Sequence, residues 1–114
     1  MLGLSANLRY FMCIQEVDMR NGFDGLAGIV RNHLKQDPIS GDVFIFINNR
    51  RTHIKLLYWD GDGFALFYKR LERGRYARTA GNALSQQLSR QELMMLLEGL
   101  SYKGVKKSKR YIFG

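Results

Sequence analysis

Apolar positions along this 114-residue chain follow two kinds of pattern. Short continuous runs rich in aromatic and β-branched residues, typical of buried strands, occur at 8–17, 43–47, 55–59 and 64–68. Apolar residues at helical spacing predict two amphipathic helices, at 19–34 and 93–100. Segment 79–84 is a turn or a short strand. The order of elements predicts a single α+β domain, with an antiparallel meander of about four to five strands and two packed α-helices.

The clearest short-range signal is Asp60-Gly61-Asp62-Gly63, which lies between the third and fourth of these runs. Aspartate and glycine between two apolar runs predict a β-hairpin with its tip at the centre of this segment. This register places Trp59 opposite Phe64. Both faces of the hairpin are then largely apolar, so we expect it to lie in a sheet that is covered at least in part on both sides.

Capping residues give the limits of the two helices. Asp18 can accept the unpaired amides of a first helical turn, and Pro38 ends the first helix. Ser89 and Glu92 form a capping box that starts the second helix, which ends near Gly99. The first helix also contains three glycines, at positions 22, 25 and 28. They indicate either weak helix propensity that packing overrides, or a smooth surface that another backbone approaches.

Positive charge is concentrated in the C-terminal part of the chain. The formal net charge is +8 and the sequence pI is about 9.9. Residues 1–48 hold four basic and five acidic side chains, whereas residues 49–114 hold fourteen and five. Such an excess favours a polyanionic partner, most often nucleic acid, with an acidic membrane surface, an acidic protein or mere solubility as alternatives. We divide the chain into a domain at 1–102 and a basic tail at 103–114.

Cysteine usage and hydropathy bear on the cellular compartment. Cys13 is the sole cysteine, so the chain has no internal disulfide. The sequence shows no signal peptide and no apolar run long enough to cross a bilayer. We therefore expect a cytoplasmic protein that is not associated with a membrane.

The sequence contains no P-loop, no His-Glu-x-x-His motif and no dinucleotide-binding fingerprint. Cys13, His33 and His53 carry no local signature of a nucleophile with its base. Asp60 and Asp62 are close enough to hold a divalent metal. However, aspartate beside glycine at a hairpin tip is favoured by hydrogen bonds to its own backbone. We therefore predict no catalytic residue, no metal ligand and no cofactor.

Basic residues gather at the end of the hairpin opposite its tip. Antiparallel pairing brings the loop before the third strand next to the end of the fourth strand. Guanidinium groups bind phosphate oxygens bidentately, and Tyr68 and Tyr76 among the cations can stack on exposed bases. The predicted nucleic-acid-binding residues are Arg50, Arg51, His53, Lys55, Lys69, Arg70, Arg73 and Arg75, with Arg78 in the same segment. A solvated, solubilising face is the alternative interpretation.

Four segments together carry a family resemblance: DMRNGFDGL at 18–26, NRR at 49–51, KLLYWDGDGF at 55–64 and YKRLERGRY at 68–76. Through them the chain resembles the small accessory protein, often called TnpB, that the second reading frame of insertion sequences of the sixty-six family encodes. The match runs from about Leu8 to Tyr76, with a looser fit through the second helix. The resemblance implies a role in bacterial DNA transposition beside a separate, larger acidic-triad transposase. The RNA-guided nuclease of the same name is unrelated.

Four positions depart from the usual pattern of that family. Asn21 stands where lysine is common, and Asn48 stands where an arginine often precedes Asn-Arg-Arg. Ala77-Arg78 replace an aromatic-proline pair. The first two changes remove positive charge, which weakens the case for an essential phosphate contact at either position.

Residues and resemblance together lead us to expect a non-catalytic accessory factor in bacterial DNA transposition, with DNA and the element-encoded transposase as its partners. It would bind DNA, or a transposase–DNA complex, through the basic base of the central hairpin. The alternative is an adaptor that docks the transposase through the glycine-bearing helix face or the apolar sheet, without direct DNA binding. A minor alternative is a metal-dependent nuclease that uses Asp60 and Asp62.

Overall fold

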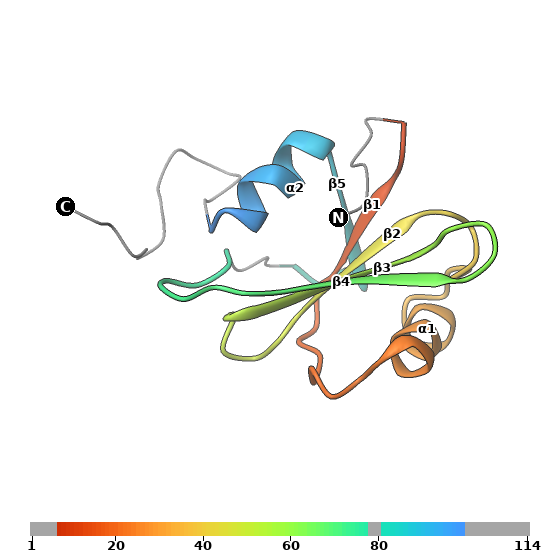
Figure 1. Ribbon diagram of the computed structural model, residues 1–114, viewed down its shortest axis with the longest axis horizontal. Coiled ribbons are helices and arrows are strands. Elements are labelled where there is room, and N and C mark those ends of the chain that lie inside the picture. Colours follow the sequence, from red (N-terminus) through yellow and green to blue (C-terminus); the bar gives the residue numbers. More distant parts are fainter. Residues whose placement is uncertain (1–6, 78–80, 100–114) are drawn as a thin grey trace.

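The computed structural model describes residues 7–77 and 81–99 (Figure 1). Its elements follow in the order β1 (Tyr10–Cys13), α1 (Phe23–Asn32), β2 (Val43–Ile47), β3 (His53–Trp59), β4 (Phe64–Arg70), β5 (Ser85–Leu88) and α2 (Arg90–Leu97). The described residues thus form one sheet and two helices, which confirms the predicted α+β class.

The sheet has the strand order β4-β3-β2-β1-β5. Strands β2, β3 and β4 form the predicted antiparallel meander. In contrast, β1 pairs in parallel with β2, with Tyr10 beside Val43, because α1 lies between them in the chain and reverses its direction. β5 then pairs antiparallel with the other side of β1. The sheet is therefore mixed at this end, and β4 is one of its two edges.

The two helices cover opposite faces of the sheet (Figure 1). On the α2 side, Leu93 and Leu96 pack in one core with alternate residues of the strands, among them Ile45 and Leu56. On the α1 side, Leu26 and Val30 pack in a second core with Phe44, Phe46 and Leu57. β2 lies in the middle of the sheet and is buried along its whole length. Successive side chains of a strand point to opposite faces of the sheet and so pack into the two cores in turn. This explains why the strands are apolar on both faces.

The first helix begins later than predicted, with Gly22 as its N-cap residue. Asp18 does not cap it. Its Oδ1 accepts the backbone N–H of Arg20 at 2.8 Å, and its Oδ2 lies 2.7 Å from the Arg20 guanidinium. The hydrogen bonds from Arg20 lower the pKa of the Asp18 carboxyl to about 2. The helix ends at Asn32, before Pro38, with His33 as its C-cap.

The three glycines of this region meet no other backbone among the described residues. A Cβ at Gly22 or Gly28 would enter open space, and one at Gly25 would meet the side chain of Asn21. The surface over Gly22 and Gly28 is therefore open.

The C-terminal elements combine a confirmed cap with an unpredicted strand. The Ser89 Oγ accepts the backbone N–H of Glu92 at 3.1 Å, and the Glu92 carboxylate accepts the Ser89 N–H at 2.8 Å, which is the predicted capping box. β5 was not predicted because Ser-Gln-Gln-Leu has no apolar pattern. Gly74, with a φ of +78°, lies in the segment after β4 and outside every strand. This left-handed conformation, which glycine adopts without strain, lies at a bend of the segment.

Candidate nucleic-acid interface

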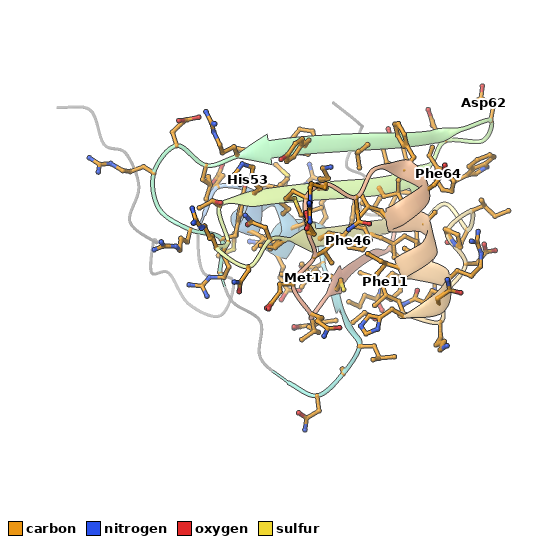
Figure 2. All side chains as sticks on the ribbon, turned by 90° about the horizontal axis from the view of Figure 1, so that it is seen from below. Phe11, Met12, Phe46, His53, Asp62 and Phe64 are labelled. Atoms are coloured by element: carbon orange, nitrogen blue, oxygen red, sulfur yellow. The ribbon has the colours of Figure 1, made fainter. Side chains whose placement is uncertain are left out.

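The β3–β4 hairpin has two chemically different ends, and Figure 2 shows His53 at one and Asp62 at the other. At the tip, Asp60 N–H donates to the Gly63 carbonyl at 2.8 Å, and Gly61 has a φ of +87°. This turn sets the predicted register, with Trp59 opposite Phe64. The same register places His53 opposite Arg70 at the far end, which we call the basic end. It comprises the 48–53 turn, the last residues of β4 and the segment 71–76.

Asn48 organises the turn that leads into β3. Its Oδ1 accepts the backbone N–H groups of Thr52 at 2.9 Å and His53 at 3.0 Å, and its Nδ2 donates to the Thr52 hydroxyl at 3.1 Å. Arg51 adopts a φ of +58° within this turn. From the sequence alone, Asn48 is notable only because it stands where the family often has an arginine. The amide side chain instead holds the loop that carries Arg50 and Arg51.

The same network orients the imidazole of His53. The Thr52 hydroxyl accepts from Asn48, so it donates to His53 Nδ1, which lies 2.7 Å away. We assign the ring proton of the neutral imidazole to Nε2 on this basis. Nε2–H is then a donor available to an acceptor such as a phosphate oxygen.

The return segment after β4 joins the basic end through the 48–53 turn. Tyr76 N–H donates to the Arg51 carbonyl at 2.7 Å, and Arg75 Nε donates to the Arg50 carbonyl at 3.0 Å. Arg50, Arg70, Arg73 and Arg75 are exposed, and Arg51 and His53 are half-buried. The predicted gathering of these residues by antiparallel pairing is thus present in the fold. Arg78 and the basic tail lie outside the described residues.

Lys55 does not lie on the surface with the other cations. Its side chain is buried, and its ammonium donates to the carbonyls of Met19 at 2.7 Å and Asn21 at 2.9 Å. The same nitrogen lies 4.6 Å from the centre of the Tyr68 ring. Lys55 therefore links the loop before α1 to the sheet, and its ammonium packs against the ring of Tyr68. It is not positioned to contact a ligand.

Lys69 is also engaged within the fold. Its Nζ donates to the Leu97 carbonyl at 2.8 Å, at the C-terminus of α2. A cation is favoured at this end of a helix because the last carbonyls are unpaired and the helix dipole is negative there. Lys69 thus lies on the α2 side of the sheet, whereas His53, Tyr68 and Arg70 alternate onto the α1 side.

Tyr68 is the exposed aromatic residue of the basic end, with 53% of its surface accessible. Its ring lies 5.8 Å from that of His53, tilted by 40°. Together with Lys69, Arg70 and Glu72 these two residues line a shallow hollow of about 500 Å³. Glu72 pairs with the Arg70 guanidinium at 2.9 Å, but both side chains are exposed, so water screens this pair strongly.

Tyr76 is not available for stacking. Only 1% of its surface is exposed, it packs in the core on the α2 side, and its hydroxyl donates to the Lys69 carbonyl at 3.4 Å. Burial raises the pKa of its phenol well above the ordinary value. The expectation that Tyr76 is a base-stacking residue is therefore wrong, because its side chain turns inward from the segment that carries Arg75.

Candidate catalytic groups are not assembled in the described part of the chain. Within residues 7–77 and 81–99 no three His, Cys, Asp or Glu side chains are grouped as metal ligands. Asp60 and Asp62 are both exposed at the tip. Cys13 and His33 line a common cavity of about 250 Å³, but Cys13 is buried, and burial raises the pKa of its thiol. A protonated thiol is a poor nucleophile.

Neither α1 nor α2, the helices of the described residues, has the length and apolarity that a bilayer crossing requires.

The fold and the basic end together define a small α+β protein whose exposed chemistry is cationic and aromatic. The family model described as "IS66 Orf2 like protein" matches residues 8–107. The relatives include two proteins of Sinorhizobium fredii strain NBRC 101917 / NGR234, each named as uncharacterized. One, y4jC, is 36% identical over 94% of this chain and 92% of its own length; the other, y4hO, is 34% identical over 90% of each. No solved structure matches significantly.

The chain belongs to the IS66 Orf2-like family. This membership implies an accessory role in insertion-sequence transposition, and the family is not known as catalytic.

Proposed function

We propose that this chain is a non-catalytic accessory factor that binds DNA, or a transposase–DNA complex, through the basic end of the β3–β4 hairpin. The observation that carries the proposal is the exposed Tyr68 ring beside His53, with Arg70 opposite His53 and with Arg50 and Arg75 joined to the same end. Cations beside an exposed aromatic ring suit a ligand that carries both phosphates and bases.

Lys55 and Lys69 differ from the other predicted site residues because their ammonium groups bind backbone carbonyls. The site therefore divides into residues that would contact DNA and residues that would support the fold. Arg50, Arg70, Arg73 and Arg75 would contact phosphates, and the His53 Nε2–H would add a directional donor. Lys55 and Lys69 would act through the fold, because their ammonium groups already bind backbone carbonyls. Phosphate contacts of this kind give affinity that falls as salt rises and that depends little on base sequence.

A DNA titration tests the proposal. We would measure fluorescence anisotropy with duplexes that carry the element's terminal repeats and with unrelated duplexes, at low and at physiological salt. The double variant Arg50→Glu/Arg70→Glu should weaken binding by tenfold or more, since each reversal replaces an attraction to phosphate by a repulsion. The matched control, Arg31→Glu/Lys35→Glu, makes the same change in net charge on exposed residues outside the basic end. Absence of binding even at low salt, or equal losses in the two double variants, contradicts the proposal.

A second candidate, an adaptor that docks the transposase, is favoured by the outer face of α1. Gly22 and Gly28 leave open space around α1, and Phe23, which follows Gly22 in the chain, is 48% exposed. The variant Gly28→Arg introduces a long charged side chain there, from a Cβ that meets nothing within 4 Å. If α1 docks the transposase, this variant loses co-purification with nuclease-treated transposase but keeps its DNA affinity. Unchanged co-purification argues against this face.

A further inference from the structure

The two edges of the sheet differ sharply. β5, at one edge, is four residues long and polar, which is how proteins commonly keep edges from pairing with other chains. β4, at the other edge, is seven residues long, reads Phe-Ala-Leu-Phe-Tyr-Lys-Arg and contains no proline. Among the described residues β4 pairs only with β3, and Figure 2 shows it running along the outside of the sheet. A long apolar edge of this kind is a template for a further strand.

The hairpin turn fixes which backbone groups face that edge. Asp60 N–H donates to Gly63 and Leu71 N–H donates to Thr52, so the intervening odd-numbered residues of β4 bond to β3. Bonded and non-bonded pairs alternate in an antiparallel ladder. The even-numbered residues therefore direct their N–H and C=O groups outward. These residues are Phe64, Leu66, Tyr68 and Arg70.

We propose that β4 pairs antiparallel with β4 of a second copy of this chain, centred on Leu66. This register makes hydrogen-bonded pairs from the outward-facing residues alone, with Leu66 opposite Leu66 and Phe64 opposite Tyr68 of the second copy. Aromatic residues directly opposite each other stabilise such pairs. The edge is thus complementary to itself, as a two-fold interface requires.

Charge also favours a second copy as the occupant. The same register places the exposed Asp62 at the tip of one copy beside the exposed Arg70 at the basic end of the other, twice in each dimer. An extended peptide of unrelated sequence would carry complementary charges at both ends of β4 only by chance. The resulting sheet is continuous through both copies, and both α1 helices lie on one face of it. Strand pairing of this length is a small interface, so we expect a reversible dimer whose population rises with concentration.

Charge reversal tests this pairing without touching the core. Sedimentation velocity of the DNA-free chain, at concentrations up to about 0.1 mM, should show a monomer–dimer equilibrium. Asp62→Arg and Arg70→Asp should each raise the dissociation constant roughly tenfold, since each makes two attractive pairs repulsive. The double variant Asp62→Arg/Arg70→Asp should restore dimerisation. Asp60→Arg, in the same turn but on the β3 side, is the matched control and should leave the equilibrium nearly unchanged.

Three results would overturn the proposal. They are a wild-type chain that stays monomeric across the concentration range, single reversals that dimerise like the wild type, and a double variant no better than either single one. Circular dichroism of each variant ensures that only folded proteins are compared. Because the measurement contains no DNA, its outcome is independent of the DNA titration proposed above.

Discussion

Both ends of the β3–β4 hairpin carry a pair of neighbouring aromatic rings, but the surroundings of the two pairs differ. At the tip, Trp59 and Phe64 meet edge to face at 5.1 Å between ring centres, and the turn between them is made of aspartate and glycine. At the basic end, Tyr68 is exposed beside His53, and Arg70 lines the same hollow. The local turn determines the register of the whole hairpin, whereas the basic end depends on residues from elsewhere in the chain.

Lys55 and Arg70 illustrate this dependence on residues from elsewhere in the chain. Both are basic, and alternation places both side chains on the α1 side of the sheet. The loop before α1 crosses over Lys55 and takes up its ammonium, but it does not reach Arg70, whose guanidinium stays exposed. Sequence position near other cations therefore does not make a cation part of a binding surface. A cation is exposed for binding only where no other backbone segment packs over it.

The largest effect is expected from Lys55→Met. Methionine keeps most of the apolar stem but removes the ammonium, which leaves the carbonyls of Met19 and Asn21 without their donor. We expect a loss of about 3 kcal/mol in the free energy of unfolding, because hydrogen bonds to a charged group are worth roughly 1.5–3 kcal/mol each. Urea denaturation measures it, with Arg50→Met as the exposed control. A loss below about 0.5 kcal/mol, the usual size for surface changes, would show that Lys55 has no supporting role.

The burial of Lys55 also shows what could not be predicted from the sequence. The hairpin register, the meander and the Ser89 capping box were predictable because each depends on residues a few positions apart. The acceptors of Lys55 lie 36 and 34 positions earlier in the chain, and no local pattern reports them. Tyr76 was misplaced for the same reason, since its burial depends on packing against the α2-side core. Short-range signals thus located the candidate site, and long-range packing decided which of its residues face solvent.

The tip should be the next most sensitive position. Gly61 has a φ of +87°, which costs an L-residue about 1–2 kcal/mol. Gly61→Ala should therefore lower the free energy of unfolding by that amount, measured by urea denaturation. Gly63→Ala is the matched control in the same turn, because Gly63 lacks a positive φ and a Cβ there meets nothing within 4 Å. Equal losses in the two variants would mean that the turn conformation does not set the stability of the hairpin.

At the basic end the aromatic ring should matter for binding more than for folding. If Tyr68 stacks on a base, Tyr68→Ala should weaken DNA binding by about fivefold or more, since such stacking is worth roughly 1–3 kcal/mol per base. Tyr68→Phe keeps the ring and should bind like the wild type. Asp60→Ala at the opposite end, outside the proposed β4–β4 pairing, should leave affinity nearly unchanged. Any metal-dependent cleavage that persists in Asp62→Ala would exclude the tip as its site. Equal affinity of the Ala and Phe variants at position 68 would exclude stacking.

The smallest effect concerns Asp18, in the loop that crosses over Lys55. Hydrogen bonds from Arg20 lower the pKa of this carboxyl from an ordinary value of 3.8 to about 2 in the folded chain. A group whose folded pKa is depressed stabilises the fold above its unfolded pKa and loses that contribution as pH falls through the folded value. Asp18→Asn should therefore flatten the dependence of unfolding free energy on pH between about 4 and 2. Because the carboxylate and guanidinium are both exposed, the flattening should shrink further in high salt. An Asp18→Asn profile that parallels the wild type over this range, in low salt, would mean that the pairing with Arg20 does not hold the loop in solution.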